Sequence, residues 1–190
     1  MKRVAVYGGS FNPPHVGHAM VAAWLRWTDR VDEVWLVPTF DHAFGKVLLP
    51  FDLRVELCTA LAETVGPWVL TNPIEQDLPV PSYTVDTLGV LAKRHPNHRF
   101  HLVVGADVLP ETPRWKAWST IEERFAPIVV GRGGYPDVSG APTFPTVSST
   151  AIRDALVQGA PIDGLVPTRV LQILADADAA SLFSAVPPVH

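Results

Sequence analysis

The sequence predicts an α/β domain in which a mostly parallel sheet carries helices on both faces. Short runs rich in β-branched residues alternate along the chain with longer amphipathic segments. The short runs are almost continuously apolar, which is typical of strands that are buried on both faces. A chain of 190 residues is long enough for one such domain with a sizeable core.

Strands and helices are predicted to alternate along the chain. The predicted strands cover residues 4–7, 33–37, 68–71, 100–104 and 127–130. The predicted helices cover residues 15–26, 53–63, 83–93, 150–157 and 169–177. Prolines such as Pro14 and Pro167 stand at the edges of these segments and mark their boundaries. Because neighbouring strands of the predicted sheet are mostly parallel, the connections between them should be right-handed crossovers.

The domain organisation follows from what separates these segments. The sequence has no internal repeat and no stretch long enough to act as a linker, so we expect residues 1–190 to form a single domain. We expect its core to cover residues 1–177. The tail, residues 178–190, is small in side-chain size and poor in polar residues, which indicates fraying.

Composition excludes several classes of protein. The chain has 15 Lys and Arg against 19 Asp and Glu, a formal net charge of −4, which argues against a nucleic-acid partner. Cys58 is the only cysteine, so neither an internal disulfide nor a cysteine zinc site is expected. No apolar run approaches the roughly 18 residues of a membrane span, and the N-terminus does not resemble a secretory signal. We expect a cytoplasmic protein that has no membrane partner.

Reactive residue types collect after the predicted strands. The segments that follow the strands are residues 8–18, 38–39, 71–73, 105–107 and 131–134, and they hold glycine, hydroxyl, acidic, basic and histidine residues. In an open α/β sheet, ligands bind beyond the carboxyl ends of the strands. The sequence therefore predicts the functional site at that edge of the sheet.

The loop after the first strand is typical of a polyphosphate site. Gly8 and Gly9 let the backbone approach a ligand closely. His15 and His18 project from one face at the start of a helix, Gly17 leaves room for a ring, and the helix N-terminus favours an anion. The histidines could instead bind a metal, or be incidental to a capping loop. Neither a P-loop nor a GxGxxG motif is present, which argues against a P-loop NTPase and a nicotinamide-dependent dehydrogenase.

Two motifs resemble the signatures of the nucleotidylyltransferase superfamily. The first is His15-Val16-Gly17-His18 with Ser10 upstream, and the second is Ser148-Ser149-Thr150-Ala151-Ile152-Arg153. Read physically, Ser149 and Thr150 cap a helix, and Arg153 lies one turn further along and can reach the same anion. Pure capping is the alternative interpretation of the two hydroxyl residues.

The middle of the chain resembles the bacterial nicotinate-nucleotide adenylyltransferases. The resemblance rests on residues 81–88, on Gly105-Ala106-Asp107, on Trp115 and Trp118, and on residues 131–136, and it extends over about residues 4–174. It implies a Rossmann-like fold. It also implies a reaction in which ATP and nicotinate mononucleotide give the deamido dinucleotide and pyrophosphate in NAD biosynthesis, with Mg²⁺ held mainly by the ATP phosphates rather than by a protein metal site.

The resemblance also implies roles for individual residues. His15, His18 and Arg153 would be catalytic. The ATP site would comprise these three residues together with Gly8, Gly9, Ser10, Phe11, Gly105, Asp107, Ser149 and Thr150. The acceptor site would comprise Thr39, Lys46, Tyr83, Thr84, Trp115 and Arg132, with Trp115 stacked on the pyridine ring.

One segment departs from that family. Its members usually carry Pro-Pro-His followed by a basic residue after the second strand, whereas residues 39–46 here read Thr-Phe-Asp-His-Ala-Phe-Gly-Lys. This departure leaves open another phosphate acceptor, such as nicotinamide mononucleotide or pantetheine phosphate. A catalytically silent nucleotide sensor is a further alternative, although the complete set of signature residues argues against it. The oligomeric state is also open, with a homo-oligomer among the alternatives.

Overall fold

The protein has a Rossmann-like α/β fold, as the sequence predicts. The computed structural model describes residues 1–41 and 48–184. Within them, one sheet has the strand order β3-β2-β1-β4-β5-β6, and all neighbouring strands are parallel. The strands are β1 (Lys2–Gly9), β2 (Glu33–Pro38), β3 (Val69–Thr71), β4 (His98–Gly105), β5 (Ile128–Arg132) and β6 (Thr143–Phe144).

Helices connect and cover the strands. The α-helices are α1 (Val16–Trp27), α2 (Phe51–Val65), α3 (Thr84–Arg94), α4 (Trp118–Phe125), α5 (Ser149–Val157), α6 (Thr168–Asp176) and α7 (Ala179–Ser184), and short 3₁₀ helices occur at η1 (Ile74–Asp77) and η2 (Leu109–Arg114). None of these helices is long and apolar enough to cross a membrane, in the part of the chain that the structure describes.

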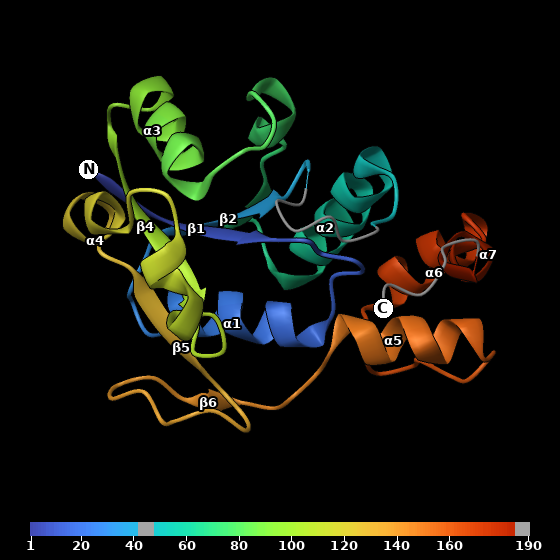
Figure 1. Ribbon diagram of the computed structural model, residues 1–190. Coiled ribbons are helices and arrows are strands. Elements are labelled where there is room, and N and C mark those ends of the chain that lie inside the picture. Colours follow the sequence, from blue (N-terminus) through green and yellow to red (C-terminus); the bar gives the residue numbers. More distant parts are fainter. Residues whose placement is uncertain (42–47, 185–190) are drawn as a thin grey trace.

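The sheet is buried on both faces, and this explains its continuously apolar strands. Along β1, Val4 and Val6 pack into the core beneath α3 and α4, whereas Ala5 packs into the core shared with α1 and α2. The side chains of β4 alternate in the same way. Figure 1 shows α3 and α1 on opposite sides of the sheet.

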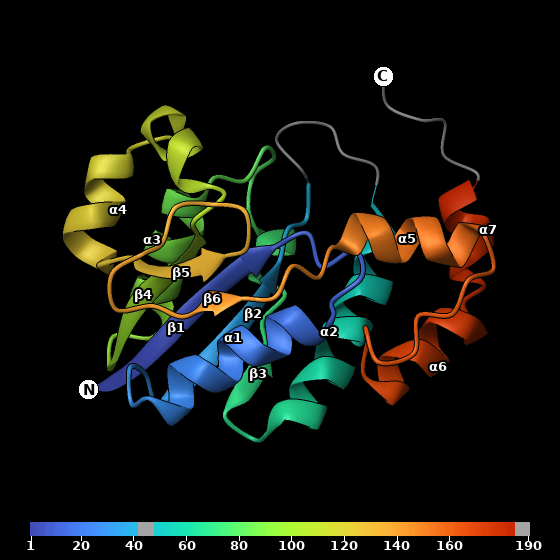
Figure 2. The same ribbon diagram turned by 90° about the horizontal axis from the view of Figure 1, so that it is seen from below.

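The last three helices lie together at one end of the molecule. Figures 1 and 2 both place α5, α6 and α7 next to one another, away from α3 and α4. Residues 179–184, which were expected to fray, form α7, in which Ala179 is only 1% exposed and belongs to the core. Small residues there indicate close packing against the neighbouring helices rather than disorder. The end of the predicted tail, residues 185–190, lies outside the described residues.

Besides α7 and the two 3₁₀ helices, the sequence pattern missed α4 and β6. Helix α4 is only 8 residues long and buries just Ile121 and Phe125, so its apolar stripe spans a single turn. Strand β6 has 2 residues and pairs only with β5. Neither segment is long enough to show a hydrophobic period.

Replacing Leu61 by alanine should lower the free energy of unfolding by about 2–5 kcal/mol, because it leaves a cavity in a packed core. Leu61 is fully buried in the core beneath α2. The matched control is Leu70→Ala on β3, where the side chain is 41% exposed and the expected loss is about 0.5 kcal/mol or less. Urea unfolding measures both changes, and equal losses would contradict the packing described here.

Candidate active site

A cavity of about 690 Å³ opens at the carboxyl edge of the sheet. It lies where β1 and β4 end side by side, which is the point at which the strand order reverses and where ligands bind in open α/β sheets. The predicted site residues in its wall are Gly8, Gly9, Ser10, His15, His18, Thr39, Tyr83, Thr84, Gly105, Asp107, Trp115 and Arg132. Residues that were predicted for the site and that lie far apart in the sequence therefore line the same cavity.

Two histidines at the start of α1 lie against each other. The ring centroids of His15 and His18 are 3.8 Å apart, with 31° between the ring planes. The backbone N–H of His15 donates to Nδ1 of His18 over 3.1 Å, so the ring proton of a neutral His18 sits on Nε2. His18, in the first turn of α1, thus satisfies the backbone N–H of the N-cap residue His15.

Both histidines are neutral near pH 7. Burial and, to a smaller extent, the positive charge of Arg132 together lower the pKa of His15 to about 4. Burial, the neighbouring His15 and Arg132 together hold the pKa of His18 well below its ordinary value. Within the described residues, Nδ1 of His15 is buried without a hydrogen-bond partner. It is a polar atom that a bound group could satisfy.

Gly17 makes room for the histidine pair. A Cβ atom at this position would lie 3.0 Å from Cε1 and Nδ1 of the His15 ring, closer than side chains normally approach. The ring therefore rests on the backbone of α1, as the sequence predicts for a glycine between the two histidines.

An ion pair joins the ends of β4 and β5 at the cavity. Nη1 of Arg132 lies 2.5 Å from Oδ2 of Asp107. Gly105 permits this arrangement, because a Cβ there would clash with the Asp107 carboxylate. The pair links Asp107, predicted for the ATP side, with Arg132, predicted for the acceptor side.

The start of α5 is attached to the loop after β1. Oγ of Ser149 donates to the carbonyl of Pro13 over 2.9 Å, and Nη1 of Arg153 donates to the carbonyl of Asn12 over 2.9 Å. Nη2 of Arg153 also donates to Oγ1 of Thr150 over 3.1 Å. These contacts bring the second signature motif to the first one across most of the chain.

The predicted cap of α5 needs correcting. Ser148, rather than Ser149 or Thr150, is the N-cap, and its hydroxyl accepts hydrogen bonds from the backbone N–H groups of Thr150 and Ala151. The hydroxyls of Ser149 and Thr150 do not cap the helix, since Oγ of Ser149 donates to the carbonyl of Pro13 and Oγ1 of Thr150 accepts from Arg153. Ser149 and Thr150, along with Phe11 and Arg153, stand outside the wall of the cavity as it is described.

Phe11 supports the histidines rather than lining the site. Its ring is buried and lies 4.9 Å from the ring of His18 and 5.8 Å from that of Tyr7. Tyr7 itself lies in the cavity wall and was not predicted from the sequence.

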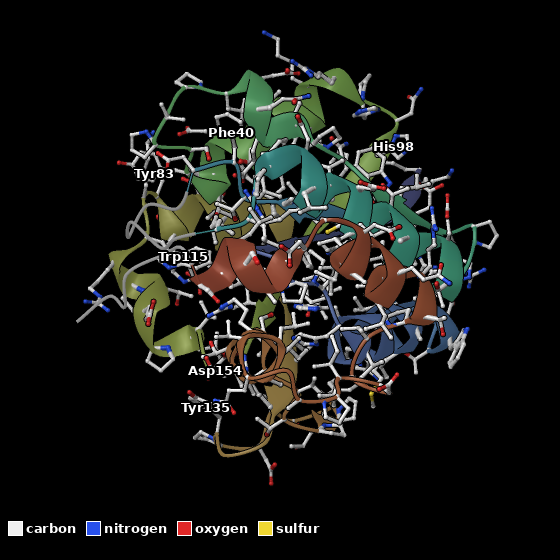
Figure 3. The ribbon with its side chains drawn as sticks, turned by 90° about the vertical axis from the view of Figure 1, so that its right-hand side faces the viewer. Phe40, Tyr83, His98, Trp115, Tyr135 and Asp154 are labelled. Carbon is white, nitrogen blue, oxygen red and sulfur yellow. The ribbon has the colours of Figure 1, made fainter. Side chains whose placement is uncertain are left out.

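Aromatic side chains line the opposite side of the cavity. Tyr83 is the N-cap residue of α3, and Thr84 is the first residue of that helix. Figure 3 shows Tyr83 and Trp115 on the same side of the molecule, and both lie in the cavity wall. Nζ of Lys116 is 4.7 Å from the Tyr83 ring centroid and 2.7 Å from Oδ2 of Asp86. Lys46, predicted for the acceptor site, lies outside the described residues.

Two buried charged residues at or near the cavity were not predicted from the sequence. Glu75 lies in the wall, and burial raises the pKa of its carboxyl group, while hydrogen bonds from Ser82, Phe40 and Thr87 oppose the rise. Arg54 is 1% exposed. A signal for Arg54 was available, because it falls on the apolar stripe of its helix with Leu57, Cys58 and Leu61. No comparable signal marks Glu75.

Comparisons with known proteins identify the family. The model for cytidylyltransferase-like proteins matches residues 6–155. A probable nicotinate-nucleotide adenylyltransferase of Anaeromyxobacter sp. (strain K) is 48% identical over 174 residues, covering 90% of this chain and 92% of that protein. The chain belongs to the nicotinate-nucleotide adenylyltransferase family. A second probable member, from Myxococcus xanthus (strain DK1622), is 45% identical and covers 89% of this chain and 90% of its own.

A solved member of the nicotinate-nucleotide adenylyltransferase family has the same fold. The nicotinic acid mononucleotide adenylyltransferase of Plasmodium falciparum, complexed with NaAD, superposes with a TM-score of 0.78 at 18% identity, over 95% of this chain and 98% of that chain. Family membership makes the present chain a nucleotidyltransferase, a class of enzyme in which a divalent metal ion accompanies ATP.

The neutral histidines predict how stability depends on pH. The unfolded chain binds a proton at His15 near pH 6.5, whereas the folded chain does so only near pH 4. Between these values the unfolded state holds more protons, so the free energy of unfolding should fall as the pH is lowered, by about 1.4 kcal/mol per pH unit for this residue. Above about pH 6.5 this contribution is complete.

Urea unfolding between about pH 7 and pH 5 measures this slope. His15→Asn should reduce the slope of the free energy of unfolding against pH by the contribution of about one proton, because the variant lacks the group that titrates differently in the two states. Parallel curves for the wild type and the variant would show that His15 is not held neutral.

Proposed function

We propose that this protein transfers the AMP part of ATP to nicotinate mononucleotide and releases pyrophosphate, a step of NAD biosynthesis. The observation that carries the proposal is the cavity between β1 and β4. The histidine pair and the start of α1 stand on one side, and Tyr83, Thr84 and Trp115 stand on the other. Relatives that share 45–48% of the sequence bear the name of this activity.

The chemistry needs little from the protein beyond placement. The phosphate of the acceptor is an anion near pH 7, so no strong base is required. Its oxygen attacks the α-phosphorus of ATP in line, and the bond from that phosphorus to the bridging β-oxygen breaks. Pyrophosphate leaves with the electron pair. Catalysis then rests on positioning and on stabilising charge at the α-phosphoryl group.

His18 is assigned to the α-phosphate. Its Nδ1 is occupied by a backbone N–H, so Nε2–H is left to donate to an anionic oxygen. His15 is assigned to the neighbouring phosphates. A bound polyphosphate brings negative charge to both rings, which raises the pKa values of both histidines. The backbone at Gly8, Gly9 and Ser10 and the N-terminus of α1 complete this side.

The β- and γ-phosphates are assigned to the start of α5. The contact of Ser149 with Pro13 and that of Arg153 with Asn12 hold this segment beside the loop after β1. The Thr150 hydroxyl and the Arg153 guanidinium are then the groups that would donate to phosphate oxygens. The Nη1 proton that Arg153 gives to Asn12 fixes the orientation of its side chain. Its remaining N–H groups can then serve phosphate oxygens. Gly105 and Asp107 are assigned to the ribose of ATP.

We expect Mg²⁺ to arrive with ATP as part of the substrate. Mg²⁺ prefers hard oxygen ligands, usually keeps several waters, and is well served by phosphate oxygens. In the described residues no three His, Cys, Asp or Glu side chains gather into a metal-binding group.

The acceptor is assigned to the aromatic side of the cavity. The N-terminus of α3, at Tyr83 and Thr84, favours the carboxylate of nicotinate, and Trp115 offers a face for the pyridine ring. Arg132, with Thr39 and Lys46, is assigned to the acceptor phosphate. Pantetheine phosphate has neither an aromatic ring nor a carboxylate to occupy these positions.

Pyrophosphate release from ATP and Mg²⁺ tests the proposal when three acceptors are compared. We expect turnover with nicotinate mononucleotide to exceed that with nicotinamide mononucleotide and with pantetheine phosphate. Turnover with only another acceptor would keep the chemistry and overturn the acceptor. Tight ATP binding without turnover of any acceptor would favour a sensor.

His18→Ala should lower kcat by a factor of about 100 to 1,000, because it removes a donor to charge that develops in the transition state. The circular dichroism spectrum should be unchanged. The matched control is Trp27→Ala at the exposed end of α1, where the side chain is 77% exposed. Near-normal turnover of the His18 variant would remove the role assigned to this residue.

A further inference from the structure

Two buried side chains of opposite charge hold one peptide group between them. Nη1 of Arg54 donates to the carbonyl of Thr39 over 2.7 Å, and the backbone N–H of Phe40 donates to Oε2 of Glu75 over 3.1 Å. The carbonyl and the N–H belong to the same peptide bond. In a trans peptide they point in opposite directions, so each charge meets the end of the peptide dipole that it attracts.

Arg54 also holds the loop that follows β1. The same Nη1 donates to the carbonyl of Ser10 over 3.0 Å, and Nε donates to the carbonyl of Leu49 over 2.9 Å. The guanidinium is buried and donates these hydrogen bonds to three different backbone segments. It therefore fixes the ATP-side loop, the end of β2 and the start of α2 relative to one another.

Glu75 also holds the segment that leads into α3. Its Oε2 accepts from Oγ of Ser82 over 2.9 Å, and its Oε1 accepts from Oγ1 of Thr87 over 3.1 Å. Ser82 and Thr87 flank Tyr83 and Thr84, where the acceptor is assigned. Every one of these partners donates to Glu75, which is what an ionised carboxylate requires.

We propose that Arg54 and Glu75 are a pair of positioning residues that sets the acceptor segment of residues 82–87 at a fixed place relative to the ATP loop. The peptide between Thr39 and Phe40 is the link between them. Neither side chain is assigned to a reacting atom. Because in-line transfer demands that the acceptor phosphate lie close to the α-phosphorus, a small displacement of one loop against the other lowers the rate steeply. This inference rests on the function proposed above.

The two residues should affect the two substrates differently. Glu75→Gln keeps the size of the side chain but turns an acceptor oxygen into a donor, so it should raise KM for nicotinate mononucleotide by at least about tenfold. The Kd for ATP, measured without acceptor, should stay within about twofold. Arg54→Lys keeps the charge but loses the planar guanidinium that donates to three carbonyls. It should therefore weaken the binding of both substrates, raising the Kd for ATP and the KM for nicotinate mononucleotide.

A double variant tests whether the pair acts through one peptide. If it does, the combined Arg54→Lys and Glu75→Gln variant should raise the acceptor KM by less than the product of the two single effects. The control is Leu61→Ala on the same helix as Arg54, which should lower the melting temperature and leave both substrate constants unchanged. A purely structural role would make Glu75→Gln behave like this control.

Hydrogen exchange of the ligand-free protein separates this inference from the proposed function. In Glu75→Gln, exchange should speed up at the Phe40 amide and across residues 82–87, but not in α2. Such a change without turnover of nicotinate mononucleotide would leave the positioning pair intact and overturn the function. Turnover by the wild type, with unchanged exchange and an unchanged acceptor KM in the variant, would overturn the positioning pair.

Discussion

The rest of the site depends on the parallel pairing of β1 with β2 on one side and β4 on the other. Val6 of β1 pairs with Trp35 of β2 and with Leu102 of β4, so three strands advance together toward one edge. The strand order reverses at β1, and the connecting helices therefore cover opposite faces on its two sides. This topology by itself leaves a crevice between the ends of β1 and β4.

This arrangement puts polar groups where burial controls their charge. The histidines of α1 are neutral because they are buried and lie near Arg132. A bound anionic phosphate would oppose this shift and raise the pKa values of both histidines. Backbone interactions complete the framework. Arg153 holds the carbonyl of Asn12, and Arg54 holds those of Ser10, Thr39 and Leu49. Two arginines, one from α2 and one from α5, thus hold the loop after β1 at Ser10 and at Asn12.

Much of the fold and of the site could be predicted from the sequence, because the deciding signals are local. Continuous apolar runs identify buried parallel strands, and the residues that follow each run must meet at one edge. The start of α5 could not be predicted to the residue, since Ser148, Ser149 and Thr150 are three hydroxyl residues in succession and only geometry shows which one caps. Helix α4 gave too few apolar residues for a period. Arg54 was missed although its place on the apolar stripe of α2 marks it as buried. Glu75 was missed because no pattern in its own segment shows that it binds the peptide group between Thr39 and Phe40.

The central claim is that the site works by placing two bound substrates for direct transfer. The stereochemical course at the α-phosphorus tests it most directly. ATP with sulfur in place of one non-bridging α-oxygen is chiral at that phosphorus, and the configuration of the dinucleotide product can be compared with that of the substrate. A single in-line displacement predicts inversion. Retention would contradict the account, because it requires two successive displacements and therefore a nucleotidyl group carried by the protein itself.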